Sequence, residues 1–200
     1  MAPSMKEGWT PDQTIVRIDQ PERYTGLERI MLVAQGDLQR LLSAFFADVI
    51  NVEVLYAHNT SRHLAASPET PVIQTRKVLL KCRSVVVCTA TSTVTFTSPE
   101  CERLMLDEKF AIGQTFRYMK EIPAFRLKSV LIAGTPSGEE ELSRTYTLAC
   151  PGIHCEILEV FPSRSMFTDG EEWFAQHHKR NEMDVDRNLD TDNSSDSGAE

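Results

Sequence analysis

Two neighbouring stretches of alternating side chains, residues 72–82 and 86–97, constrain the fold of this chain most strongly. In the first, apolar residues share one face with Arg76, and the other face carries the lysines. In the second, threonine occupies every second position through most of the run. Because the side chains of a strand point alternately to the two sides of a sheet, both stretches are typical of half-buried β-strands. Arg83 and Ser84 are the expected turn between them, which predicts an antiparallel pair.

Other segments predict helices and further strands. Residues 37–49 place apolar side chains at helical spacing, and Asp37 is the expected N-cap, whose carboxylate would accept free backbone N–H groups of the first turn. Ser98 is the expected cap of a second helix, and residues 112–121 predict a third. Strands are expected at 51–57, 125–133, 143–150 and 155–161. This mixed order predicts an α+β fold with a mainly antiparallel sheet.

The acidic residues gather at the C-terminal end of the chain. Of the net charge of −8, residues 181–200 contribute −6, from seven acidic residues and Arg187, so residues 1–180 carry only −2. A segment so charged and so poor in apolar residues is predicted to be disordered. We therefore expect an N-terminal extension over residues 1–26, an α+β domain over residues 27–180 and a disordered acidic tail.

Several functional classes are not indicated by the composition. No basic cluster suggests a nucleic-acid partner, and no apolar run suggests a membrane span or a signal peptide. The five cysteines are odd in number and form no CxxC pair, which favours reduced thiols in a cytoplasmic protein. Cys150, His154 and Cys155 bracket a turn, but their spacing fits no standard zinc site. We expect no metal, no nucleic acid, no membrane partner, and a monomer or homodimer.

Charged residues inside apolar strands are the candidates for chemistry. Arg76 lies among the apolar residues of its strand, and the strand near residue 159 contains Glu156 and Glu159 on opposite faces. A buried charge must be paired or must serve a ligand, because its desolvation costs several kcal/mol. The alternation alone does not choose between the two glutamates. It also leaves open that Arg76 lies at a sheet edge or forms a structural ion pair.

Four stretches, taken in order, resemble the chorismate-lyase-like family, in its wider branch more than in the bacterial chorismate pyruvate-lyases. They are LERIMLVAQGDLQRLLSAFFADVINVEVL, TRKVLLKCRSVVVCTATSTV, IGQTFRYMKEIPAFR and RTYTLACPGIHCEILEVFP. The resemblance spans residues 27–162. It implies a six-stranded antiparallel sheet with helices packed against it, enclosing a small ligand pocket.

The resemblance also implies which residues form the site. The ligand-binding arginine of the family matches Arg76, and its acidic residue matches Glu159. Ligand-contacting backbone positions of the family map onto Asp37, Gly113 and Gln114. The family enzyme has a methionine where this chain has Asp37, and a carboxylate there would repel an anionic substrate.

From the resemblance we expect a cofactor-independent carbon–oxygen lyase that acts on a small carboxylate, either chorismate-like or from secondary-metabolite biosynthesis. The planar guanidinium of Arg76 would bind the carboxylate through two parallel hydrogen bonds. Glu159 would be the general acid at the leaving-group oxygen, and no metal or organic cofactor is needed. Since a fold does not fix a reaction, two alternatives stay open. One is an isomerase or cyclase using the same pocket, and the other is a non-catalytic small-molecule-binding module.

Overall fold

Six antiparallel strands form the central sheet, in the order β3-β4-β5-β8-β7-β6. The computed structural model describes residues 5–181 of the chain. The bounds of the strands are Ile50–Asn59 (β3), Val72–Cys82 (β4), Val85–Phe96 (β5), Ala124–Gly134 (β6), Glu140–Cys150 (β7) and Ile153–Phe161 (β8). The order contains two units of three consecutive strands, β3–β5 and β6–β8, which meet where β5 pairs with β8. We call this β5–β8 pairing the seam.

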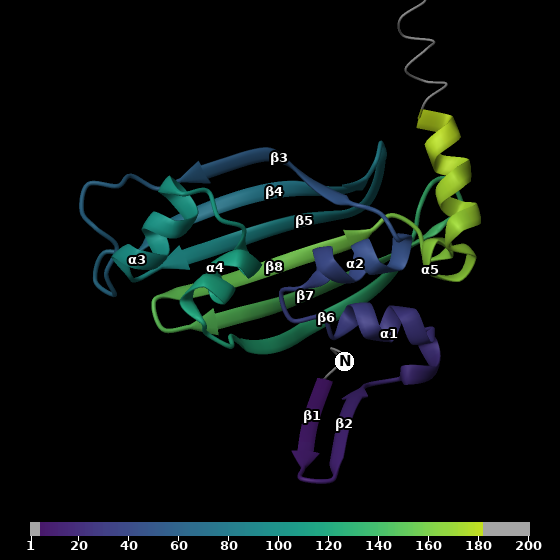
Figure 1. Cartoon of the computed structure of the whole chain (residues 1–200), viewed down its shortest axis with the longest axis horizontal. Coiled ribbons are helices and arrows are strands. Elements are labelled where there is room, and N and C mark those ends of the chain that lie inside the picture. Colours follow the sequence, from purple (N-terminus) through teal and green to yellow (C-terminus); the bar gives the residue numbers. More distant parts are fainter. Residues whose placement is uncertain (1–4, 182–200) are drawn as a thin grey trace, which may run out of the picture.

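Helices cover one face of this sheet (Figure 1). Two of them, α2 (Leu38–Phe46) and α4 (Ile112–Met119), lie over the central strands. The remaining bounds are Pro21–Arg23 (η1), Gly26–Leu32 (α1), Pro99–Glu102 (α3), Arg103–Asp107 (η2, a π-helical turn that continues α3) and Ser165–Asp169 (α5), with a further helical segment at 171–181. The predicted α+β fold with a mainly antiparallel sheet is therefore confirmed.

The strand boundaries follow the alternation in the sequence closely. The β4 strand has the predicted bounds of residues 72–82, and Arg83 and Ser84 form the turn to β5. Ser98 caps α3 as predicted, because its side chain accepts a hydrogen bond from the backbone N–H of Glu100. The threonines of β5 lie on the face of the sheet away from the buried residues Val94 and Phe96.

The two ends of the chain were predicted to lie outside the α+β domain. The predicted extension, residues 1–26, contains a hairpin of β1 (Met5–Thr10) and β2 (Gln13–Ile18), which forms a separate two-stranded sheet. The predicted disordered tail lies outside the described residues, apart from residue 181.

The buried side chains form two clusters with a gap between them. One cluster packs around α1, α2 and α5 and includes Leu38 and Val78. The other packs around α3, η2 and α4 and includes Leu148 and Ile157. These four residues also line a cavity, so the cavity lies where the two clusters meet over the middle of the sheet.

Candidate functional site

The cavity is roofed by the first residues of α2 and α4 and floored by the central strands. Its volume is about 110 Å³. For comparison, an apolar cavity of about 150 Å³ holds one benzene molecule, so the space suits a ligand built on one small ring. The lining is mostly apolar and comprises Gly36, Leu38, Gln39, Val52, Arg76, Val78, Leu80, Ala90, Ser92, Ala111, Ile112, Gly113, Tyr146, Leu148, Ile157 and Glu159.

Arg76 contributes an unpaired cation to the cavity. It is half-buried on β4, on the same face as Val78 and opposite Ser92 of β5. No residue in the described part of the chain hydrogen-bonds to its guanidinium or forms an ion pair with it, and burial lowers the pKa of Arg76. The hydroxyl of Ser92, which is also buried, has no hydrogen-bond partner within residues 5–181. Neither a sheet-edge position nor a structural ion pair therefore accounts for Arg76.

Glu159 lies on the cavity side of β8 and is buried. Its Oε2 accepts a hydrogen bond from Nε of Arg144 at 2.6 Å, and its Oε1 accepts one from the Tyr146 hydroxyl at 2.8 Å. Glu156, in contrast, is exposed on the other face and pairs with Lys128. The structure thus places Glu159, and not Glu156, among the residues that line the cavity together with Arg76.

Arg144 is the main residue of the site that the sequence reasoning missed. Its side chain is fully buried, and its Nη1 donates to the carbonyl oxygens of Leu32 and Ala34, each at 2.9 Å. Its guanidinium carbon lies 4.4 Å from the ring centroid of Tyr146. Burial acts to lower the pKa of Arg144, but the carboxylate of Glu159 outweighs this effect and the pKa is raised. Arg144 therefore joins Glu159 to the segment that leads into α2.

The signal for Arg144 was present in the sequence. Leu142, Arg144, Tyr146 and Leu148 alternate along β7 and are all buried. A cation in such an apolar alternation is the pattern that drew attention to Arg76, and the same rule applied to β7 finds Arg144.

The beginnings of two helices face the cavity together. Gly36 and Leu38 line it at the start of α2, and Ala111 and Gly113 line it at the start of α4. The first backbone N–H groups of a helix have no acceptor within the helix, and the helix dipole places partial positive charge there. Both helix starts thus reinforce the positive charge of Arg76.

Two glycines allow these segments to approach closely. A Cβ atom built on Gly113 would lie 2.3 Å from the carbonyl oxygen of Gly36, a distance that real side chains do not tolerate. Gly36 itself has φ +83°, in the left-handed region that favours glycine. The roof of the cavity therefore depends on the absence of side chains at both positions.

The prediction that Asp37 caps α2 is wrong. Asp37 occupies the N-cap position, but its side chain makes no capping hydrogen bond. Its carboxylate instead pairs with Arg40 at 2.8 Å, because that guanidinium lies within reach one turn later. Because the half-buried carboxylate of Asp37 is engaged by Arg40, the first turn of α2 has no side-chain cap.

Asp37 and Gln114 line a neighbouring surface groove and do not line the cavity. The Gln114 side chain accepts a hydrogen bond from the backbone N–H of Ala111 at 2.9 Å and so closes the first turn of α4. Of the predicted site residues, the structure brings together Arg76, Glu159 and Gly113. Asp37 does not place its carboxylate in the cavity lining, because it lies along the groove and is paired with Arg40.

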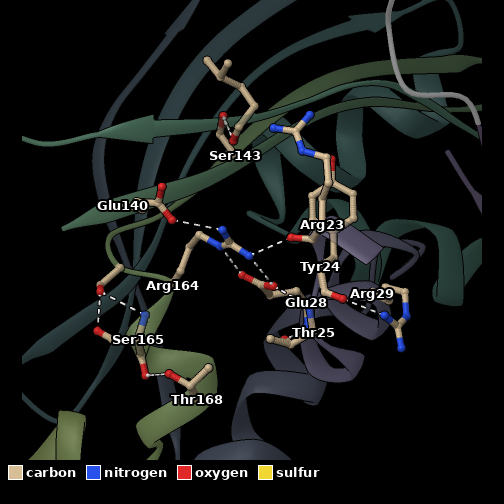
Figure 2. A network of polar contacts seen from close by, with 12 residues as sticks. Arg23, Tyr24, Thr25, Glu28, Arg29, Glu140, Ser143, Arg164, Ser165 and Thr168 are labelled. Atoms are coloured by element: carbon tan, nitrogen blue, oxygen red, sulfur yellow. Dashed lines mark hydrogen bonds and ion pairs between the residues drawn. The ribbon is translucent and has the colours of Figure 1, made fainter. Parts of the chain in front are cut away.

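A second network of hydrogen bonds, made by Arg164, fixes the N-terminal end of α1 (Figure 2). Arg164 donates to both carboxylate oxygens of Glu28, at 2.6 and 3.0 Å, and to the carbonyl oxygen of Arg23 at 2.9 Å. Glu28 also accepts from the backbone N–H of Thr25 at 2.7 Å, which completes a capping box. Arg164 thus holds the start of α1, and Arg144 holds its end. Together they position the segment that contains Gly36.

Comparison with known proteins finds no match, either among protein-family models or among curated proteins. The chorismate-lyase-like resemblance therefore stays a prediction from the sequence. Within residues 5–181 no helix is both long and apolar enough to span a bilayer.

Proposed function

We propose that this protein binds a small carboxylate in the cavity and catalyses carbon–oxygen bond cleavage without a cofactor. The observation that carries the proposal is the unpaired guanidinium of Arg76 in a cavity that also contains a buried carboxylate, Glu159. A cation without a partner is costly to bury, and a ligand carboxylate would supply the missing partner.

The contacts of Glu159 support a role in proton transfer. Both of its oxygens accept hydrogen bonds, from Arg144 and from Tyr146, and these contacts hold the carboxylate in place on the cavity side of β8, where it can reach a bound ligand. In a lyase of this kind Glu159 takes a proton from a ring carbon, and the C–H electron pair forms the new double bond. The C–O electron pair leaves with the oxygen, which then receives the proton from Glu159. The general-acid step predicted from the sequence is thus the second half of this cycle.

The experiment is to incubate the purified protein with chorismate and to follow the release of 4-hydroxybenzoate and pyruvate. Arg76→Lys keeps the charge but loses the two parallel hydrogen bonds, so we expect substrate binding to weaken by about 1–3 kcal/mol. Glu159→Gln is expected to lower the turnover rate about 10²–10⁴-fold with binding largely kept. Lys77→Met is the matched control, since Lys77 is the next residue of β4 and does not line the cavity.

A non-catalytic binding module is the second candidate. One observation favours it: both oxygens of Glu159 are already engaged by protein donors, as in a structural ion pair. In that case Glu159→Gln would lower stability and leave ligand binding intact, with no product formed by any variant. An isomerase or cyclase would consume the substrate but release no pyruvate.

A further inference from the structure

The strand β3 forms one edge of the central sheet, and in the described part of the chain no strand lies on its outer side (Figure 1). Nine of its ten residues are exposed, and only Ile50 is buried. Among residues 5–181, the backbone groups of residues 51–59 form no hydrogen bond to any segment except β4. A row of free N–H and C=O groups at the edge of a sheet is a template for a further strand.

The side chains of β3 do not protect this edge. Val52, Val54 and Leu55 are apolar, and they are 39%, 54% and 49% exposed. The strand contains no lysine, arginine or proline, and its one carboxylate, Glu53, is already paired with Lys81 of the same chain at 2.5 Å. Since charged side chains and proline are the usual means by which an edge strand avoids pairing, this edge remains open to another strand.

The opposite edge of the sheet, β6, has this protection. Arg126 and Lys128 are exposed along it, and Pro123 directly precedes the strand. Lysine and arginine side chains on an edge strand hinder the approach of a second strand, because pairing would take their charges out of water. The two edges of the sheet therefore differ, and β3 is the one suited to strand addition.

The first half of β3 has the same order of side chains when it is read from either end. Around Val52, the sequence INVEV runs apolar, polar, apolar, polar, apolar. An antiparallel pairing of two copies about Val52 places Ile50 of one copy opposite Val54 of the other. It also places Asn51 opposite Glu53. Each apolar side chain then faces an apolar one, and each carboxylate faces an amide that can donate a hydrogen bond to it.

We propose that β3 pairs with β3 of a second copy of this chain, about a twofold axis through Val52. The contact is isologous, because the same surface of each copy takes part. A strand of unrelated sequence could use the same backbone groups, but the symmetric order of INVEV favours a second copy. A β-bulge between Val54 and Tyr56 ends the regular part of β3, so the contact is short and we expect a reversible dimer. This inference is independent of the proposed lyase activity.

The first test measures the mass of the protein by analytical ultracentrifugation over a range of concentrations. The wild-type protein is expected to reach twice the mass of one chain as its concentration rises. Val54→Lys places a charge opposite the apolar Ile50 of the other copy, so the dissociation constant of the dimer should rise at least tenfold. Leu131→Lys is the matched control, because Leu131 is also an exposed apolar residue of an edge strand, β6.

This control variant should dimerise like the wild type, and circular dichroism checks that both variants are folded. Equal effects of the two substitutions would overturn the inference. A wild-type protein that stays monomeric at every concentration would also overturn it, and would leave the edge to a strand of a different protein.

Cysteine substitutions test the register of the pairing. In Val52→Cys the two thiols would lie directly opposite each other, with Cα atoms about 4.5–5.5 Å apart, a distance that a disulfide spans. In Val54→Cys they would lie about 13 Å apart along the strands, which no disulfide spans. Under mild oxidation we expect a covalent dimer from Val52→Cys and none from Val54→Cys or from the wild type. Cross-linking of Val54→Cys instead, or of neither variant, would overturn the pairing about Val52.

Discussion

At the scale of single residues, the two arginines of the site differ in what surrounds the guanidinium. Arg144 is fully buried and has three acceptors, the carbonyl oxygens of Leu32 and Ala34 and the carboxylate of Glu159. Arg76 is half-buried and has no such acceptor among residues 5–181. Arg144 is therefore held by the protein through Nε and Nη1, although its buried Nη2 has no partner among residues 5–181. Arg76 has no acceptor there and is available to a ligand.

Gly113 offers a direct test of the cavity roof. In Gly113→Ala the new Cβ would lie 2.3 Å from the Gly36 carbonyl oxygen, so α2 and α4 must move apart. We expect a loss of about 1–3 kcal/mol in the free energy of unfolding, measured by chemical denaturation. Gly134→Ala is the control, because a Cβ there meets nothing within 4 Å, and its effect should stay below about 1 kcal/mol. Equal stability of the two variants would show that the close contact is not needed.

At the scale of elements, α1 is fixed at both ends by arginines from the other end of the chain. Burial alone would raise the pKa of Glu28, but the hydrogen bonds from Arg164 and from the Thr25 backbone outweigh it, and the pKa lies below 4.5. Since the folded state depresses this pKa, the stabilisation is present above pH 4.5 and is lost as the pH falls through the folded value.

Glu28→Gln should therefore lower the free energy of unfolding at pH 7 by about 1.5–3 kcal/mol, the usual size for hydrogen bonds to a charged group. The variant should also lose less stability than the wild type as the pH falls below 4.5. Denaturant titrations at pH 7 and at pH 3.5 measure both effects. Glu22→Gln, at an exposed glutamate of η1, is the control. If the difference between wild type and Glu28→Gln is the same at both pH values, the carboxylate of Glu28 does not carry the effect.

The positions of strands and helices could be predicted from the sequence where its apolar residues follow a periodic pattern. The strands and the start of α3 followed from alternation and from one capping residue, because these signals act within a few positions. The Asp37 cap failed because the nearby Arg40 competed for the same carboxylate. The hairpin β1–β2 was not predicted, and it lies in the segment that we expected to be an N-terminal extension. Interactions between distant segments, such as Arg164 with Glu28, leave no local pattern and could not be predicted.

At the scale of the whole molecule, the reactivity of the five cysteine thiols shows whether the native fold is intact. All five are free thiols, and Cys150 is half-buried, whereas the other four are buried. Burial raises the pKa of Cys150 to about 11, so little thiolate is present at neutral pH. We expect at most one thiol to react with a labelling reagent in the native protein and five after denaturation without reductant. If the native protein no longer reacts with the reagent in Cys150→Ser, the reactive thiol is that of Cys150. Rapid reaction of two or more native thiols would contradict the burial of the other four.

The seam between β5 and β8 has a consequence for how the protein folds. Each unit of three strands joins neighbours in the chain, but the seam pairs Ala90 with Glu159, far apart in sequence. Pairings between distant segments form slowly, because a long loop must close first. Arg76 belongs to the first unit, and Glu159 and Arg144 belong to the second. The cavity therefore does not exist until the two halves of the chain have joined, and a ligand held between them favours the completed fold by mass action.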